Sequence, residues 1–408
     1  MEIQIDMLRR IIYQLLRHRH YWRLVSFSEM AELYTSRLMT IFAANLVNLF
    51  AAVYLYKLGY SVAFIVSFYA LTSLLRVPAA YFAAKYAAYF GPKHGILLAH
   101  IVRIPSLVVF ALVPAYGLPA LIAFGVLQQV SMAMYDLCYM VDFSKVKHSI
   151  HAGKEIGIMQ IVEKVARVVS PLVGGVVASL YSPQVTIVLA SIMFLLAAVP
   201  LFKTVEPTMT RVKLRIAGFP WRLALPSLIG QSAVGFDLIM SGMVWTLFVT
   251  VVILGSMGSA VYAALGGLAS LGVLASMLAA WVFGRIVDKH KGGTLMTVGV
   301  VANTILHMFR PFVTSVAGVM GVNIVNETAT SAYALPFMRH IFDVADTSGF
   351  RITYMMYIEV ALSVGAALGC GVVYLCVELL GVQYGLMAAF MIAAAYELLL
   401  LISRRTVH

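Results

Sequence analysis

Ionisable side chains inside long apolar stretches are the residues of this sequence whose types could do chemistry. Eight of them fall toward the middle of such stretches: Arg76, Arg103, Glu163, Lys164, Arg167, Asp237, Glu327 and Glu359. A charge in hydrocarbon is costly unless it is paired or hydrated, so such residues mark functional sites by default. A carboxyl group in a low-dielectric surrounding also takes up a proton more readily than in water. The candidate proton-coupling residues are therefore Glu163, Asp237, Glu327 and Glu359.

Two of these residues have a simpler explanation. Glu163 and Arg167 are four residues apart, so they share one face of a helix. A local ion pair without a role in transport accounts for them as well as proton binding does. Arg76 and Arg103 are candidate counter-charges for the carboxylates, or anchors for an anionic solute.

The composition identifies the surroundings of these side chains. Of the 408 residues, 62% are hydrophobic and 11% are charged, and the mean hydropathy is +0.93. Soluble folds carry roughly 25% charged residues, and here the apolar residues form long unbroken runs instead of amphipathic stripes. Lipid requires every backbone group to find a partner within the protein. The sequence therefore predicts an all-α integral membrane protein.

Other classes of protein fit the sequence poorly. The net charge of +12 comes from Lys and Arg residues between the apolar runs, so we expect no nucleic-acid-binding module. Cys138, Cys370 and Cys376 lie inside apolar segments and have neither disulfide-framework nor metal-ligand spacing. No cluster of His, Cys and Asp has the spacing of a metal site, and no phosphate-binding Gly-Lys-Ser/Thr motif occurs. We expect no enzyme activity, no metal and no cofactor.

The chain divides into an N-terminal segment and twelve apolar runs. Residues 1–34 place apolar side chains on one side of a helix and Arg residues on the other, which is typical of an amphipathic helix on an anionic membrane surface. A basic cytoplasmic tail is an equally good interpretation. The predicted spans are 35–57, 60–86, 92–115, 117–141, 154–180, 183–203, 224–253, 257–287, 292–314, 316–341, 350–378 and 382–403. Two six-helix bundles, over 35–203 and 224–403, would be joined by a central loop over 204–223 and followed by a tail over 404–408.

Basic residues predict the orientation of the spans. The N-terminal segment, the loops after the even-numbered spans and the pair Arg404–Arg405 carry Lys or Arg, whereas Lys57 is the single basic residue in the opposite loops. Cytoplasmic loops are enriched in Lys and Arg. Both termini are therefore expected on the cytoplasmic side.

The chain also repeats itself at an offset of 196 residues, which aligns Gly125 with Gly321, Glu163 with Glu359, and Gly175 with Gly371. Two halves related by a parallel repeat are one of the arrangements built into secondary transporters. Because Glu163 and Glu359 are equivalent in this repeat, we expect them to face each other or one shared cavity. The alternative is that both bond to polar groups at the interface between the halves.

The stretch WVFGRIVDKHKGG, residues 281–293, resembles the loop signature of the major facilitator superfamily, Gly-x-x-x-Asp-Arg/Lys-x-Gly-Arg-Arg/Lys. Gly284, Asp288 and Lys289 match that signature in place, and the last three signature positions differ. The resemblance implies the twelve-span fold of two six-helix bundles. It also implies a cytoplasmic gating loop formed by Gly284, Arg285, Asp288 and Lys289.

The first half carries a degenerate copy of this loop, AKYAAYFGPKHG. Ala84, Ala88 and Tyr89 stand where the signature has Gly, Asp and a basic residue. We therefore expect the C-terminal half to carry the conformational lock.

Span 5 is similar to a motif of proton-coupled drug antiporters in this superfamily, Gly-x8-Gly-x3-Gly-Pro-x2-Gly-Gly. Small residues in this order let helices pack closely, and a proline bends them. We interpret these positions as a helix-packing face, with an antiporter motif as the alternative. The residues are Gly157, Ser170, Pro171, Gly174 and Gly175.

The resemblance further implies that spans 1, 4, 7 and 10 line a central cavity. A pocket of amides, carboxylates and aromatic side chains suits an amphiphilic or cationic organic solute. Spans 3 and 9 are peripheral in this fold, and His307 and Arg310 near the outer surface are explained by snorkelling. Together with the two candidate arginines, the candidate substrate-binding residues are Asn45, Asn48, Arg76, Arg103, Gln128, Gln129, Asp136, Gln231, Asn323 and Asn326.

We therefore predict a secondary active transporter that moves a small organic solute by alternating access, driven by the proton gradient, as in drug efflux. A uniporter or anion exchanger that uses Arg76 and Arg103 is one alternative, and a non-transporting receptor or partner subunit with this fold is another. The expected partners are the solute, protons and membrane lipids, with no nucleic acid. The expected setting is a monomer in the cytoplasmic membrane of a bacterium or archaeon.

Overall fold

A computed structural model of the chain describes residues 27–146, 152–202, 211–288 and 292–406. Most of the predicted amphipathic segment, residues 1–26, lies outside the described residues. Residues 27–34, which were expected to belong to it, form the beginning of the first described helix instead.

The described residues of the first half are helical almost throughout. Short turns at Gly59, Gly91 and Gly117, each with a positive φ, separate successive helices. The helices are α2 (Phe27–Lys57), α3 (Val62–Phe90), α4 (Pro92–Ala111), the short α5 (Val113–Tyr116), α6 (Leu118–Val146), α7 (Ala152–Leu180), α8 (Pro183–Ala198) and the 3-10 helix η1 (Val199–Phe202).

The second half has the same plan with one irregular member. Its first span is α9 (Trp221–Leu238), the π-helix η2 (Ile239–Val244), α10 (Trp245–Phe248) and the π-helix η3 (Val249–Ile253). Segments of π-helix inside spans are found frequently at functional sites. The others are α11 (Ala260–Asp288), α12 (Gly292–Phe309) with η4 (Arg310–Phe312), α13 (Val316–Thr347), α14 (Arg351–Leu380), and α15 (Val382–Glu397) with η5 (Leu398–Thr406).

Each of the twelve predicted spans coincides with a helix or a run of consecutive helices. Nine helices in the described part of the chain are long and apolar enough to cross a membrane. Hydropathy alone does not select α7 and α13, which carry ionisable residues, and α8 has 16 residues. Several helices continue past the predicted ends, for example α13 to Thr347, because rings such as Phe143 and Phe342 pack beyond the apolar runs, with centroids 5.5 Å apart.

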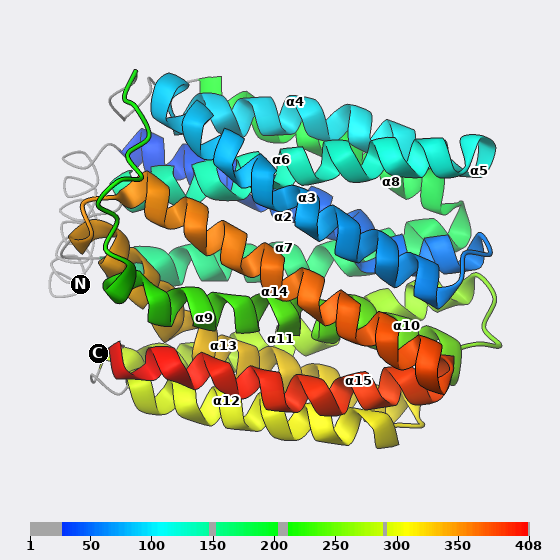
Figure 1. Cartoon of the computed structure of the whole chain (residues 1–408). Coiled ribbons are helices and arrows are strands. Elements are labelled where there is room, and N and C mark those ends of the chain that lie inside the picture. The colour runs from blue at the N-terminus through cyan, green and yellow to red at the C-terminus, as the bar shows by residue number, and fades with distance from the viewer. Residues whose placement is uncertain (1–26, 147–151, 203–210, 289–291, 407–408) are drawn as a thin grey trace, which may run out of the picture.

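The helices run side by side along one direction (Figure 1). Helices of the first half, in blue to green, occupy one side of the bundle, and α12, α13 and α15 of the second half occupy the other. The beginning of α2, the segment before α9 and the end of η5 lie at the same end of the molecule. Each half begins and ends at this same end of the molecule, because its chain crosses the bundle an even number of times.

Two helix pairs make the largest contacts between the halves: α3 packs on α14, and α7 packs on α11. Glycines allow the second contact. A Cβ atom on Gly175 of α7 would collide with the backbone carbonyl of Tyr262, and one on Gly266 of α11 would collide with the carbonyl of Pro171. On the opposite side of α7, a Cβ atom on Gly174 would lie 2.8 Å from the carbonyl oxygen of Leu46 in α2. Close backbone approach of this kind is how small residues hold membrane helices together.

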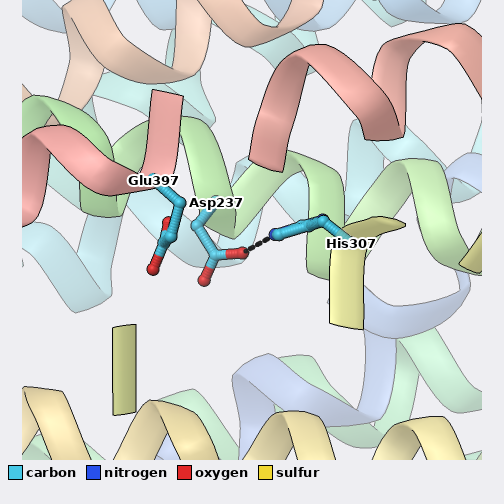
Figure 2. Close-up of side chains that lie close together, drawn as sticks. All are labelled: Asp237, His307 and Glu397. Carbon is cyan, nitrogen blue, oxygen red and sulfur yellow. Dashed lines mark hydrogen bonds and ion pairs between the residues drawn. The ribbon is translucent and has the colours of Figure 1, made fainter. Parts of the chain in front are cut away.

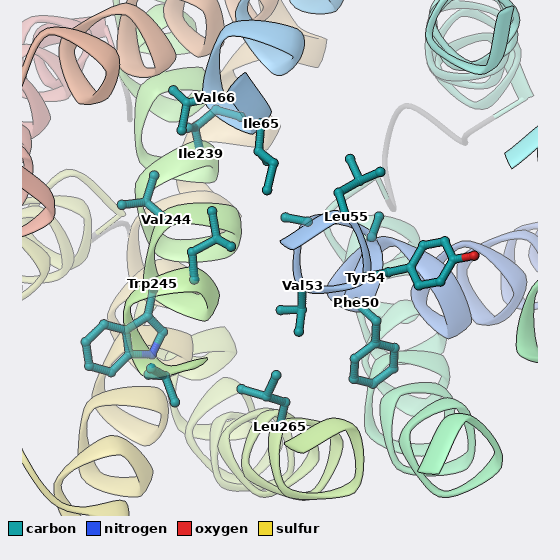
Figure 3. Close-up of a cluster of buried hydrophobic side chains, with 14 of the residues drawn as sticks. Phe50, Val53, Tyr54, Leu55, Ile65, Val66, Ile239, Val244, Trp245 and Leu265 are labelled. Carbon is teal, nitrogen blue, oxygen red and sulfur yellow. The ribbon is translucent and has the colours of Figure 1, made fainter. Parts of the chain in front are cut away.

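Buried apolar side chains form two clusters, one toward each end of the bundle. The first joins α2 and α3 to the irregular span and α11, as Figure 3 shows for Phe50, Ile65, Trp245 and others. The second surrounds the aromatic residues of α6, α13 and α14, such as Tyr139. On α2, α3 and α14 the charged residues of the candidate site fall between the segments that contribute to the two clusters.

Candidate functional site

Five charged side chains from five helices form a continuous chain, which we call the central ion-pair chain. Its members are Glu163 of α7, Arg37 of α2, Asp136 of α6, Arg76 of α3 and Glu359 of α14. Arg37 Nη2 lies 2.6 Å from Glu163 Oε1 and Arg37 Nη1 lies 3.9 Å from Asp136 Oδ1. Arg76 Nη2 lies 2.6 Å from Asp136 Oδ2, and Arg76 Nε donates to Glu359 Oε1. Alternating charges of this kind compensate one another where water is scarce.

The last link of this chain connects the two halves. Arg76 belongs to the first half and Glu359 to the second, and their helices α3 and α14 pack directly on each other. The side chains are 9% and 8% exposed, so this pair is buried. Asp136, in contrast, is 34% exposed. The middle of the central ion-pair chain is therefore less buried than the carboxylates at its two ends.

Glu163 and Glu359 do not contact each other. Each accepts hydrogen bonds from an arginine of the first half, and the two carboxylates are connected through Arg37, Asp136 and Arg76. The repeat predicted either that the two carboxylates face each other or one cavity, or that both bond to polar groups at the interface between the halves. This geometry resembles the second arrangement.

The predicted pair of Glu163 with Arg167 forms, with Arg167 Nη2 at 3.5 Å from Glu163 Oε2, but Arg167 is 46% exposed. The closer partner of Glu163 is Arg37, which also stacks over the ring of Tyr139 at 4.5 Å. The sequence interpretation missed Arg37, although it lies just inside the first predicted span. A cation near a span end is readily explained by snorkelling, and only the tertiary contacts reveal its role.

A second polar group, which we call the Asp237 cluster, lies within the C-terminal half. Asp237 Oδ1 is 2.9 Å from His307 Nε2 and accepts a hydrogen bond from Ser241 Oγ at 2.6 Å. Asp237 Oδ2 accepts from the hydroxyl of Tyr333 at 2.8 Å. The π-helix η2 places Ser241 next to the acid at the end of α9.

Arg310 completes the Asp237 cluster. Its Nη2 donates to Ser241 Oγ at 2.8 Å and to Asn326 Oδ1 at 2.6 Å, and its Nη1 lies 3.0 Å from His307 Nδ1. The guanidinium group has only donors, so His307 Nδ1 accepts, and Nε2 carries the hydrogen that His307 donates to Asp237. The imidazole is thereby held as one neutral tautomer.

These contacts correct the expectation for span 9. Snorkelling at the outer surface predicted exposed ends for His307 and Arg310, but both side chains are 0% exposed. Arg310 follows the end of α12 in η4 and turns inward, where Asp237 supplies the compensating charge and the rings of Trp245 and Phe390 flank the guanidinium group.

Asp237, His307 and Glu397 lie close enough together to suggest a metal site (Figure 2). One ligand atom from each lies within 4.8 Å of the others, and all three are buried. However, both ring nitrogens of His307 are engaged, and the cation Arg310 lies beside them. A metal ion would have to displace the Nε2 hydrogen against this charge, so the geometry suits a hydrogen-bonded cluster better. Sequence reasoning missed Glu397, whose Oε1 accepts from Asn303 Nδ2 at 3.2 Å.

Lys164 makes another connection between the halves. From α7 its Nζ donates to Ser276 Oγ of α11 at 2.7 Å and to Ser331 Oγ of α13 at 2.8 Å. Ser331 in turn donates to the backbone carbonyl of Glu327, whose side chain is half-buried.

The polar candidates for substrate binding fall into two groups. Asn323 and Asn326 already have partners in the second half, since Asn323 Oδ1 accepts from Trp245 Nε1 at 2.8 Å. Asn45 donates to the carbonyl of Ile41 in its own helix at 2.8 Å. The second group is less engaged: the amide oxygens of Gln128 and Gln129 are buried without a partner among the described residues, Gln231 is half-buried, and Asn48 is exposed.

Arg103 is the remaining candidate, and its environment is unusual. It is 3% exposed, its Nη2 donates to Asn48 Oδ1 at 3.2 Å, and its guanidinium carbon lies 5.4 Å from the ring centre of Phe194. Nε and Nη1 have no hydrogen-bond partner in the described part of the chain. Among the described residues, these buried donors therefore have no acceptor.

The side chains of the predicted gating loop lie outside the described residues. Gly284, Arg285 and Asp288 belong to the last turns of α11, and Lys289 falls in the gap that follows. The side-chain surroundings of Gly157 are likewise not described.

Comparisons with known proteins place this geometry in a family. The family model for the Major Facilitator Superfamily matches residues 33–338. A search of curated protein sequences gives no match. Among solved structures, a POT family transporter in complex with 5-aminolevulinic acid superposes with a TM-score of 0.73 at 12% identity, covering 92% of this chain and 96% of that one.

Two further structures have the same fold, with lower TM-scores. The human organic anion transporter MFSD10 (TETRAN) has a TM-score of 0.66 at 12% identity and covers 91% of this chain and 99% of its own. The nucleoside transporter NupG has a TM-score of 0.65 at 12% identity, with coverages of 92% and 99%. At this identity the structures establish the fold alone, whereas the family match spans most of the chain. The chain belongs to the major facilitator superfamily and is a multi-pass membrane protein that acts as a secondary transporter of small solutes, not as an enzyme.

Proposed function

We propose that this transporter is coupled to protons and that the Arg76–Glu359 ion pair is the coupling site. The observation that carries the proposal is that this buried pair joins the two halves across the contact of α3 with α14. Alternating access requires the halves to move against each other. Because the Arg76–Glu359 pair lies at the contact between the halves, a proton that neutralises Glu359 acts directly on the contact that must open.

The proton acts on the partners of Arg76. When Glu359 binds a proton its negative charge disappears, and Arg76 keeps Asp136 as its one anionic partner. The contact between α3 and α14 then loses an ion pair, and the two helices become free to separate. Release of the proton to the other side of the membrane restores the pair.

The second connection between the halves behaves differently. Lys164 bonds to the neutral hydroxyls of Ser276 and Ser331. Because neither hydroxyl changes charge when a carboxyl group binds a proton, this connection persists while the first one opens. The α7–α11 contact therefore serves as the fixed side of the movement.

An anion exchanger that uses Arg76 and Arg103 is the second candidate, and the two arginines differ in their fitness for it. Arg76 is engaged by two carboxylates. Arg103 has no ion pair among the described residues and keeps two free nitrogens. This observation favours a role for Arg103 in solute binding within either mechanism.

The membrane orientation follows from the charges at one end of the bundle. The start of α4, the end of α6, the segment before α9 and η5 lie at that end (Figure 1), and these elements carry Lys93, Lys145, Arg215 and Arg404. We place this end in the cytoplasm of a prokaryotic cell, where the proton gradient across the cytoplasmic membrane supplies the driving force.

Spin-label distance measurements test the proton-coupling proposal without knowledge of the solute. With the native cysteines replaced by serine, labels at Tyr89 of α3 and Thr347 of α13, both exposed, report the separation of the halves. In the unsubstituted background the distance distribution should change between alkaline and acid pH. In Glu359→Gln it should match the acid distribution at every pH.

Glu378→Gln is the matched control, because Glu378 lies on the same helix and is exposed. It should show the full pH response. A Glu359→Gln protein that still responds to pH in the normal way would remove Glu359 from the coupling site.

A further inference from the structure

The two halves contain the same pair of residues in their third long helix. His100 and Arg103 in α4 have the spacing of His307 and Arg310 at the junction of α12 and η4. The offset between these pairs is 207 residues and that of the internal repeat is 196, so the sequence alignment does not pair them. The equivalence is therefore visible in the surroundings of the side chains and not in the alignment.

Both arginines stack on the same ring position. The guanidinium carbon of Arg103 lies 5.4 Å from the ring centre of Phe194, and that of Arg310 lies 5.6 Å from the ring centre of Phe390. The two phenylalanines are 196 residues apart, which is the offset of the repeat. Each half thus places a guanidinium group against the phenylalanine at the same position of the repeat.

Both histidines also bond to the first helix of their own half. His307 Nε2 lies 2.9 Å from Asp237 Oδ1, and His100 Nε2 lies 2.9 Å from the hydroxyl of Thr40. The Thr40 hydroxyl donates its hydrogen to the carbonyl of Ser36 at 2.7 Å. His100 is therefore the donor to Thr40, just as His307 is the donor to Asp237.

The difference between the copies is the carboxylate. In the C-terminal half Asp237 supplies a negative charge, and two nitrogens of Arg310 have partners. In the N-terminal half Thr40 is neutral, one nitrogen of Arg103 has a partner, and the Nδ1 atom of His100 has none in the described part of the chain. The first half thus has a buried cation, Arg103, but no carboxylate at the position that corresponds to Asp237.

Neighbouring charged residues do not supply the missing negative charge beside Arg103. Asp136 and Arg76 are the charged groups whose fields act on Arg103, but Asp136 is already held by Arg76 at 2.6 Å and by Arg37 at 3.9 Å. The partner that Arg103 does have, Asn48, is exposed. An anion that reaches Asn48 therefore meets the free donors of a buried guanidinium group next to it.

We propose that Arg103, together with Asn48, binds the carboxylate of a small organic anion, which is the solute of this transporter. The site rests on the proposed function as a transporter but not on proton coupling. A guanidinium group offers two parallel donors in the geometry that a carboxylate accepts, and charge-assisted bonds of this kind are stronger than neutral ones. The solute supplies the negative charge that Asp237 supplies in the other half.

Ligand-induced thermal shifts of the purified full chain at constant pH test this proposal. The probes are acetate, benzoate and gluconate, with acetamide, benzamide and gluconamide as neutral counterparts and chloride as an inorganic anion. At least one carboxylate should raise the melting temperature well beyond its amide and beyond chloride at the same concentration. In Arg103→Gln the affinity for that carboxylate should fall by about 10- to 100-fold.

Arg310→Gln is the matched control, because Arg310 is the equivalent cation with its charge already compensated. Without any solute, Arg103→Gln should keep or raise the melting temperature, since it removes an uncompensated buried charge, whereas Arg310→Gln should lower it. Equal stabilisation by carboxylates, amides and chloride would overturn the proposal. So would undiminished carboxylate binding in Arg103→Gln, or a drop in its solute-free stability as large as that of Arg310→Gln.

These outcomes are independent of the coupling site. A Glu359→Gln protein that responds normally to pH would refute proton coupling and leave carboxylate binding at constant pH intact. Undiminished carboxylate binding in Arg103→Gln, together with a pH response that Glu359→Gln abolishes, would refute the carboxylate site and leave proton coupling intact.

Discussion

The partners of the Arg76–Glu359 pair are unequal, and this predicts unequal consequences for removing either side chain. Arg76 is bonded to Glu359 and to Asp136, whereas Glu359 has Arg76 as its one ion-pair partner in the described residues. In Glu359→Gln the guanidinium group keeps Asp136 at 2.6 Å. In Arg76→Gln the carboxylate of Glu359 stays buried without a cation, and Asp136 retains Arg37 at 3.9 Å.

The number of charged partners that remain in each variant determines how far the free energy of unfolding falls. Leaving a buried charge without its partner costs about 3–5 kcal/mol, whereas loss of one charge-assisted hydrogen bond with the other partner retained costs about 1.5–3 kcal/mol. Arg76→Gln should therefore lower the free energy of unfolding by roughly 1–3 kcal/mol more than Glu359→Gln. The double variant should be more stable than Arg76→Gln alone, because it removes the unpaired carboxylate.

Buried thiols provide the assay. Cys138 and Cys370 are buried and become reactive as the bundle opens, so a maleimide fluorophore reports unfolding in detergent. The four proteins of the cycle are compared at one pH and one detergent concentration. An Arg76→Gln protein as stable as Glu359→Gln would refute the unequal roles of the two side chains. A double variant less stable than both single variants would refute them as well.

Three further outcomes are expected. Gly175→Ala places a methyl group against a backbone carbonyl of α11 and should lower both thermal stability and transport, whereas Gly371→Ala, at the equivalent repeat position with open space around it, should change neither. Asp237→Asn removes the charge that compensates a buried guanidinium group and should destabilise the chain by about 2–4 kcal/mol in the same thiol assay. The control is Asp346→Asn, because Asp346 is 35% exposed in its ion pair with Arg351. It should destabilise the chain by less than about 1 kcal/mol. Asp288→Ala should slow interconversion of the two access states while carboxylate binding stays intact, and unchanged turnover would give the predicted gating loop a topological role only.

Most of the spans could be predicted from the sequence because they depend on hydropathy. Each long apolar run became a helix, since lipid leaves the backbone no other way to satisfy its hydrogen bonds. The helix ends were less predictable. The extension of α13 to Thr347 depends on aromatic contacts between helices distant in sequence.

The candidate site was predictable as a set of residues but not as a set of pairs. Arg76, Asp136 and Glu359 stand out in the sequence because charges are rare in spans. Nothing in their spacing shows that they bond to one another, since they come from three different helices. Arg37 and Glu397 were missed because a charge near the end of a span has a simple explanation in snorkelling, and only packing shows that it points inward.

The charge count of the centre connects the two proposals and predicts how solute and proton move together. Four cations and four carboxylates balance there when the half-exposed Arg167 is set aside: Arg37, Arg76, Arg103, Lys164, Asp136, Glu163, Glu327 and Glu359. A proton on Glu359 leaves one positive charge in excess, and Arg103 is the cation with free donors to receive an anion. Burying a net charge in the membrane is costly, so the proton and the carboxylate should bind together and cross together.

In proteoliposomes, transport of the carboxylate that binds most tightly should then acidify the interior, even with the membrane potential clamped at zero. The acidification should exceed that caused by passive entry of the acid form into protein-free liposomes. Solute movement that generates a membrane potential, or that leaves the internal pH unchanged, would separate the two sites and contradict this count.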